Sequence, residues 1–385
     1  MRGWHQAWPG LLATLNGVGL CRFAYTPLIP FMIGSGVVTA TGAGYLGAAN
    51  VAGYLAGAGL AAPLGERLGL GSVIRASFAL TILALSACIL EGGFWWYVPW
   101  RFLAGAAGAV LMVLAPSFLL ADVEPRERGR SGGVIYTGVG AGIALSSLVV
   151  PALATLNLAL AWAGLALAAL LTALFTWPRW RGRGPLVNRG LATGRFTLPI
   201  VLISLAFGMD GVGFIPHMLF WVDYIARTLD RGTTAGALQW LIFGLGAAIG
   251  PGLGGVIGDR IGLGRALVLV FALKGFAVLL PTIATATPFL ALSSLVAGAF
   301  TPGIAALSAA RLTELVSPAE RTRAWGFATL TFGVFQAGGA YAMSYAYGRL
   351  GSYTPLYAAG AGFEALGVVF TLIALVTSGD RRSQR

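Results

Sequence analysis

Several charged or titratable side chains stand inside long apolar segments of this chain. Among them are Arg22, Asp210, His217, Lys274 and Glu364. A charge at the centre of a membrane-spanning helix costs at least about 2.5–3.5 kcal/mol, so such a side chain does not face lipid. An arginine there can hold an anionic group through two parallel hydrogen bonds, and a carboxylate can take up and release a proton. These residues are therefore the first candidates for chemistry.

The apolar segments that carry these residues have the length and composition of membrane spans. Hydrophobic residues make up 57% of the chain and charged residues only 10%. A run of roughly 17–25 apolar residues is long enough to cross a bilayer as a helix. The connecting segments are short and leave no room for a soluble domain. Twelve runs are predicted, at 8–33, 43–63, 72–90, 95–121, 131–154, 158–177, 196–222, 234–257, 265–284, 288–313, 324–347 and 354–377.

The sequence repeats itself with an offset of 193 residues. GERLGLG at 65–71 returns as GDRIGLG at 258–264, and PRERGR at 125–130 returns as PAERTR at 318–323. Two copies of one six-span unit are therefore predicted. The expected domains are an N-terminal bundle over 1–177, a basic linker over 178–195, a C-terminal bundle over 196–378 and a tail over 379–385.

The basic residues predict an orientation in the membrane. The formal net charge is +12, and if both termini face the cytoplasm, only Arg227, Arg231 and Arg349 lie in connecting segments on the opposite side. Cytoplasmic loops of membrane proteins carry such an excess of basic residues. We expect a multi-pass protein of the bacterial cytoplasmic (inner) membrane with both termini in the cytoplasm and a linker that touches anionic lipid. Nucleic-acid binding is not expected, because it needs a clustered basic face on a soluble domain.

The repeated loop after the second run of each half carries a family resemblance. With twelve runs in two halves, it resembles the major facilitator superfamily of secondary transporters, whose motif G-x-x-x-D-[RK]-x-G-x-[RK] occupies this loop. Both copies depart from the motif, because Gly71 and Gly264 stand at its final basic position. The resemblance implies an all-α membrane protein with twelve transmembrane helices in two pseudo-symmetric six-helix bundles. It also implies a gating latch, with an ordinary surface ion pair as the alternative, formed by Glu66, Arg67, Asp259 and Arg260.

The first run narrows the resemblance. The string GLCRFAYTPLIP at 19–30 resembles the bacterial YbfB-type branch, whose first span carries G-x-x-R-F-A-Y-T-P-L-x-P. In the fold of this superfamily, the first and seventh spans line a central cavity. Arg22 is then a candidate for binding an anionic substrate, with a structural anchor as the alternative. Asp210 stands at similar depth in the seventh span. We predict that it pairs with Arg22 in the empty site and couples transport to protons when substrate or protonation releases the pair.

Further polar residues receive roles from the same fold. Lys274 and Glu364 fall in the ninth and twelfth runs, which are neighbouring outer helices in that fold. A structural ion pair between them is predicted, with a role in transport as the alternative. Arg101 resembles an arginine that the family often carries in its fourth span; we assign it to gating, with snorkelling to the interface as the alternative. For His217, a satisfied buried hydrogen bond is the alternative to ligand binding. The remaining expected substrate contacts are Tyr25, Asn50, Tyr54, Tyr136, His217, Gln239 and Gln336.

These features predict a secondary transporter that works by alternating access on a small organic solute. An anion is the first choice because of Arg22, and proton coupling is a further hypothesis. An exporter of amphipathic or drug-like compounds is the main alternative, followed by a membrane sensor that does not transport. No G-x-x-x-x-G-K-[ST], HExxH or GxSxG string occurs, so neither ATP-driven pumping nor enzymatic activity is expected. We expect a monomer without cofactor or metal.

Overall fold

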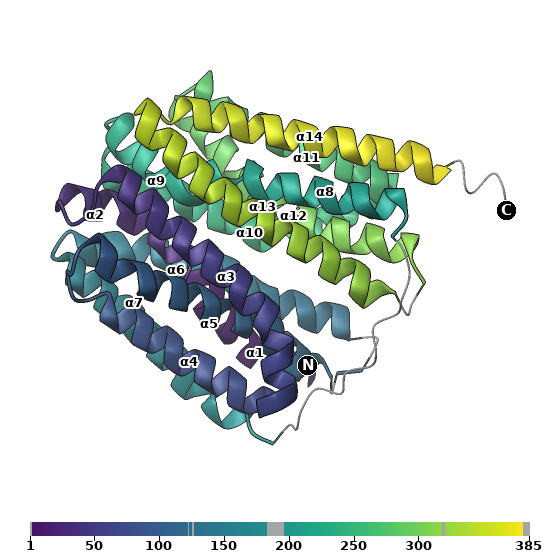
Figure 1. The fold of residues 1–385 in the computed structure, drawn as a ribbon, viewed down its shortest axis with the longest axis horizontal. Helices are drawn as coiled ribbons and strands as arrows, with labels where there is room; N and C mark the ends of the chain where they lie inside the picture. Colours follow the sequence, from purple (N-terminus) through teal and green to yellow (C-terminus); the bar gives the residue numbers. More distant parts are fainter. Residues whose placement is uncertain (1, 122, 125–126, 183–195, 318–319, 380–385) are drawn as a thin grey trace. The chain divides into compact units, whose positions relative to one another are not determined.

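The computed structural model describes residues 2–121, 123–124, 127–182, 196–317 and 320–379, and every regular element in these ranges is helical (Figure 1). The long helices of the first half are α1 Arg2–Thr14, α3 Ala40–Leu68, α4 Leu70–Ala87, α5 Phe94–Leu120, α6 Arg128–Ala154 and α7 Leu158–Thr176. Those of the second half are α8 Leu198–Gly213, α10 Gly232–Ile261, α11 Leu263–Leu279, α12 Thr287–Leu315, α13 Arg321–Leu350 and α14 Thr354–Gly379.

Ten helical segments in the described ranges are long and apolar enough to cross a membrane. The other two predicted spans are α3 and α13, which are 29 and 30 residues long. Both are rich in glycine, alanine and tyrosine and poor in large aliphatic side chains, which lowers their hydropathy. Length and order therefore agree with the twelve predicted runs.

The first and seventh spans are interrupted helices. After α1 the chain forms a π-helical stretch (Leu15–Leu20), a 3₁₀ stretch (Phe23–Leu28) and the short helix α2 (Ile29–Gly34). After α8 it forms a π-helical stretch (Pro216–Phe220), α9 (Trp221–Asp223) and another π-helical stretch, Tyr224–Thr228. Proline removes a backbone donor and clashes with the preceding turn, so it breaks the helical ladder. The matching Ile-Pro pairs of the two halves, Ile29-Pro30 and Ile215-Pro216, lie in these interruptions.

The repeated loops have repeated backbone conformations. α3 and α4 are joined by Gly69 (φ 81°, ψ 139°), and α10 and α11 are joined by Gly262 (φ 84°, ψ 144°). An L-residue with a side chain rarely adopts such a positive φ, so both positions require glycine. The other repeated segment, 125–130 and 318–323, also has matching backbone angles. Glu127 precedes α6 with a φ of −98°, and Glu320 precedes α13 with a φ of −92°. The offset of 193 residues thus describes structure as well as sequence.

The contacts of the chain define two compact units. The first comprises Met1–Asn188 with Leu219–Gly244, and the second comprises Arg189–Met218 with Leu245–Arg385. In the first unit, Trp162 stacks on Tyr97 with ring centroids 6.0 Å apart. In the second, Phe207 stacks on Trp325 and on Phe332, at 5.5 Å and 4.4 Å. The boundaries 1–177, 178–195, 196–378 and 379–385 stay a prediction, and the linker from residue 183 and the tail from residue 380 lie outside the described residues.

Glycine seams bring backbones into contact inside each unit. On α3, a Cβ added at Gly53 or Gly57 would overlap the carbonyl oxygens of Phe102 and Ala106 on α5. On α10, a Cβ added at Gly250 would overlap the carbonyl oxygen of Ala299 on α12. Small residues at helix crossings permit this close approach in membranes. The second and fourth spans of each half therefore pack through equivalent seams.

Candidate functional site

Arg22 lies at the interruption of the first span, between the π-helical and 3₁₀ stretches. Its side chain is buried, with only 8% of the residue exposed. The guanidinium carbon lies 4.9 Å from the ring centroid of Tyr54 on α3 and 5.3 Å from that of Phe23. Phe23 in turn contacts Trp240 of α10, with centroids 6.0 Å apart. A guanidinium placed on aromatic faces keeps its charge in an otherwise apolar setting. The structure thus brings together two predicted substrate contacts, Arg22 and Tyr54.

Side chains from two helices stabilise the interruption beside Arg22. The N–H of Tyr25 bonds the carbonyl of Arg22, three residues back, which leaves the carbonyl of Cys21 without its helical donor. Asn50 Nδ2 donates to this carbonyl at 3.1 Å and to the carbonyl of Arg101 at 2.9 Å. Arg101 Nη1 also donates to Cys21, at 3.1 Å. Carbonyls freed by a broken membrane helix need such donors.

This arrangement gives Arg101, Asn50 and Tyr25 structural contacts that the sequence did not reveal. Arg101 is 1% exposed, so it is a buried residue rather than one that snorkels. Its guanidinium carbon lies 4.1 Å from the ring centroid of Tyr25, whose hydroxyl donates to the carbonyl of Ala43 at 2.9 Å. The available signal was the pair of prolines at 27 and 30, because a broken helix predicts free carbonyls nearby.

The second unit contains a buried cluster of three charged side chains. Lys274 on α11 donates a hydrogen bond to Oδ1 of Asp210 on α8, and its Nζ lies 3.6 Å from Oε1 of Glu364 on α14. All three side chains are 0% exposed. The cluster forms because α8 packs against α11 and α14, which also pack against each other (Figure 1). The structure thus brings Lys274 and Glu364 together, as expected, and adds Asp210.

Glycines make the space that this cluster occupies. A Cβ added at Gly213 would lie 2.5 Å from Oε1 of Glu364, and one added at Gly275 would lie 3.1 Å from the Cβ of Glu364. Oδ2 of Asp210 and both carboxyl oxygens of Glu364 have no hydrogen-bond partner among the described residues. The buried cluster therefore contains carboxyl oxygens that could accept further hydrogen bonds.

His217 lies in the interruption of the seventh span and is held by two neighbours. Its Nε2 lies 2.9 Å from the hydroxyl oxygen of Ser293 on α12. Ser293 uses its only proton to donate to the carbonyl of Ala277 at 2.6 Å, so Nε2 of His217 is the donor in the first bond. The ring of Tyr357 meets the imidazole edge to face, with centroids 5.5 Å apart. His217 therefore has a hydrogen-bond partner at Nε2, and its role in ligand binding stays a prediction.

The sequence as a whole matches one protein family. The model of the family described as "Uncharacterised MFS-type transporter YbfB" matches residues 14–372, which is most of the chain. The chain belongs to this family. The YbfB-type resemblance carried by the first span is thereby confirmed.

Relatives of this YbfB-type transporter support the same assignment. "Uncharacterized MFS-type transporter Ent638_1421" from Enterobacter sp. (strain 638) is 26% identical over 232 residues, covering 53% of this chain and 60% of the relative. The match thus spans about three fifths of the length of that curated relative. The crystal structure of a D-xylose–proton symporter is similar in fold, with a TM-score of 0.72 and 15% identity over 95% of this chain and 96% of that one. The predicted all-α, twelve-span architecture of the major facilitator type is confirmed.

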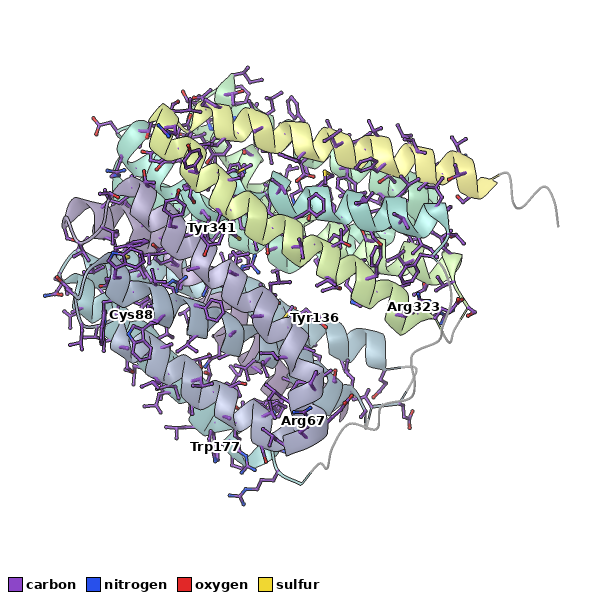
Figure 2. All side chains as sticks on the ribbon, in the orientation of Figure 1. Arg67, Cys88, Tyr136, Trp177, Arg323 and Tyr341 are labelled. Carbon is purple, nitrogen blue, oxygen red and sulfur yellow. The ribbon has the colours of Figure 1, made fainter. Side chains whose placement is uncertain are left out.

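The other roles predicted for this YbfB-type transporter stay predictions. Asp210 belongs to the second unit and Arg22 to the first, so their pairing stays a prediction, and the partner observed for Asp210 is Lys274. Tyr136 on α6, which is labelled in Figure 2, is 45% exposed. Gln239 on α10 and Gln336 on α13 are buried. Within the described residues, no ion pair involves the loop residues, so the latch also stays a prediction for Glu66, Arg67, Asp259 and Arg260.

Proposed function

We propose that this protein is a secondary active transporter that moves a small organic anion across the bacterial cytoplasmic membrane by alternating access, with both termini in the cytoplasm. The observation that carries the proposal is the buried guanidinium of Arg22 at the interruption of the first span. The planar guanidinium group can donate two parallel hydrogen bonds to the oxygens of a carboxylate or phosphate. The rings of Tyr54 and Phe23 lie within cation–π range of this guanidinium, which sets the orientation of the substrate under this proposal.

The interrupted helices support transport as the purpose of this site. Secondary transporters commonly build their substrate sites from discontinuous helices in equivalent positions of two repeats. Here the first and seventh spans are both interrupted at their Ile-Pro pairs. The fold is also shared with a D-xylose–proton symporter, which favours coupled transport of a small molecule.

The residues around Arg22 divide into two groups under this proposal. Arg22 and Tyr54 contact the substrate. Tyr25, Asn50 and Arg101 hold the interrupted backbone that presents Arg22, since each donates to a carbonyl or packs on a residue that does. The loop residues Glu66-Arg67 and Asp259-Arg260 help to stabilise the outward-facing state.

Ligand-induced thermal stabilisation tests the substrate class. The purified protein is heated with panels of mono- and dicarboxylates, sugar phosphates, organic cations and neutral amphipaths, because a ligand that binds the folded state raises Tm by mass action. An anion that raises Tm is then tested on Arg22→Lys. This variant keeps the charge and loses the planar guanidinium group, so affinity should fall by about tenfold or more.

A second arginine on an aromatic ring provides the matched control. Arg75 on α4 lies over Trp177 with 5.9 Å from guanidinium carbon to ring centroid, and Arg75→Lys should leave the anion response unchanged. Uptake of the stabilising anion into proteoliposomes then distinguishes a transporter from a sensor, which would bind without moving it. Equal anion responses in wild type and Arg22→Lys would remove Arg22 from the substrate site.

Export of amphipathic compounds is the second candidate function. Phe23, Trp240 and Phe243 form a chain of aromatic contacts beside Arg22, with centroid distances of 6.0 Å and 4.7 Å. Stacking against such aromatic rings suits a flat apolar compound. A Tm response to neutral or cationic amphipaths, without a response to anions, would favour this function over anion transport.

A further inference from the structure

The three buried charges of the second unit do not cancel. Lys274 supplies one positive charge, whereas Asp210 and Glu364 supply two negative charges when both are ionised. All three side chains are 0% exposed. A buried charge without a partner is costly, and two carboxylates that share a site do not both remain ionised. The fully ionised cluster would therefore carry one uncompensated negative charge.

The helices packed around the cluster supply no second cation among the described residues. The segment after α8 contributes His217, which is held by Ser293 and by the ring of Tyr357 from α14. α13 contributes the neutral Gln336, whose Cβ packs against Gly211. The other charged or titratable groups of these helices stand near helix ends or are exposed: Arg265 on α11, Arg311 and Glu314 on α12, and Arg321, Arg323, Tyr341, Tyr345, Tyr347 and Arg349 on α13.

We propose that Asp210, Lys274 and Glu364 form a proton-binding site that holds one proton on its two carboxyl groups. One proton removes the excess negative charge and leaves a single ion pair with Lys274. The ion pair and the proton together make the buried cluster neutral, so its charge balance requires no counter-ion and no further charged side chain.

The geometry assigns the proton to Glu364. Lys274 donates its hydrogen bond to Asp210, which keeps Asp210 as the ionised partner. Glu364 lies farther from the ammonium, at 3.6 Å, and neither of its oxygens accepts a hydrogen bond from a described residue. The two carboxyl groups lie around the same ammonium group, and Oδ2 of Asp210 is an acceptor without a partner among the described residues. A protonated Glu364 gains the donor that this acceptor lacks.

A sodium ion is a poorer match for the same excess charge. Metal cations of this kind require several oxygen ligands around one point. Here the ammonium of Lys274 already occupies the position between the carboxylates. Within the described part of the chain, no group of three or more His, Cys, Asp or Glu side chains could hold a metal ion.

The position of Asp210 connects this site to the interrupted seventh span. Its carbonyl accepts a hydrogen bond from the N–H of Phe214 at 3.2 Å, one of the last helical bonds before Pro216. Loss of the proton from Glu364 would make both carboxylates compete for Lys274 and so pull on the end of α8. This coupling role rests on the proposed transport function, whereas proton binding by the cluster does not.

Infrared spectroscopy of the purified protein tests the proton directly, without substrate. A buried protonated carboxyl group has a C=O stretching band that is distinct from the carboxylate bands and exchanges slowly in D₂O. At neutral pH the wild type should show such a band, and it should disappear as the pH is raised. Replacing choline chloride with sodium chloride at constant pH should leave it unchanged.

Two variants test the charge count. Glu364→Gln removes the protonated group, and Asp210→Asn removes the excess negative charge so that Glu364 ionises against Lys274. Both should lose the band. Glu314→Gln, which alters a half-exposed glutamate paired with Arg311 in the same unit, should keep it. Size-exclusion chromatography and circular dichroism establish that each variant is folded, and the wild-type pH titration stands without them.

Three results would overturn the proposal. They are a wild type without the band, a band that persists in Asp210→Asn or Glu364→Gln, and a band that sodium removes at constant pH. Because no transport is measured, failure here leaves the anion-transport proposal standing, and loss of the anion response leaves the proton site standing.

Discussion

Lys274 donates a hydrogen bond to Asp210 and lies 3.6 Å from Oε1 of Glu364. The first contact is a direct charge-assisted hydrogen bond, and the second is an ion pair at longer range. Because the three residues come from α8, α11 and α14, one ammonium group joins three helices of the second unit. The interruption of the seventh span begins about one turn after Asp210, so this junction also anchors the start of the interruption.

Removing the shared ammonium should destabilise the second unit strongly. Lys274→Met deletes the only cation of the cluster and leaves buried carboxyl groups without their partner. Breaking a buried ion pair in this way costs about 3–5 kcal/mol. The free energy of unfolding, measured in detergent micelles, checks the prediction.

The matched control for this variant is Arg311→Met. Arg311 pairs with Glu314 at 2.6 Å, but the Glu314 side chain is 39% exposed. Pairs open to solvent contribute about 0–1 kcal/mol. The prediction is wrong if Lys274→Met lowers the free energy of unfolding by no more than Arg311→Met does.

The sequence located the buried charges along their helices but did not give their partners. Hydropathy showed that Asp210 and Arg22 stand deep in their spans, and similar depth suggested that they pair. Which neighbour a side chain meets depends also on how each helix is rotated about its axis, and the nearly uniform apolar composition of these helices hides that angle. Lys274 and Glu364 could be paired from the resemblance, because it supplied the adjacency of their helices.

The roles of Tyr25 and Asn50 show a second limit of the sequence. Both are polar residues in apolar spans and were expected to meet substrate, yet their observed bonds go to backbone carbonyls. The carbonyl of Cys21 is freed by a break in the backbone hydrogen bonding of the helix. The prolines of the sequence indicate the region of this break but not the residue at which it occurs. By contrast, the repetition of the loops was predictable, because the glycine motif recurs at a fixed offset and Gly69 and Gly262 have matching backbone conformations.

The two loop glycines should be intolerant of alanine. Gly69 and Gly262 have φ of 81° and 84°, where a Cβ atom costs roughly 1–2 kcal/mol. Gly69→Ala and Gly262→Ala should therefore each lower Tm. Gly59→Ala, at an open helical position of α3, should leave Tm unchanged or raise it. Equal effects at Gly59 and Gly69 would show that the turn does not require glycine.

The seam between α10 and α12 should resist even one added methyl group. A Cβ at Gly250 would overlap the carbonyl oxygen of Ala299, so the helices must separate, at about 1–3 kcal/mol. Gly252 lies on the same helix and faces open space. Thermal unfolding of Gly250→Ala and Gly252→Ala compares the two positions. A smaller loss at Gly250 than at Gly252 contradicts the seam.

Asn50→Leu should destabilise the first unit by removing donors from the interrupted helix. Asn50 Nδ2 donates to the carbonyls of Cys21 and Arg101, and the loss of each of these buried hydrogen bonds costs about 0.5–1.5 kcal/mol. Asn157→Leu is the control. Asn157 is exposed and caps α7 by accepting from the N–H of Ala159, so its loss costs about 1 kcal/mol. Thermal unfolding should show the larger loss for Asn50→Leu. Equal losses would mean that Arg101 alone satisfies Cys21 and that the interruption does not depend on Asn50.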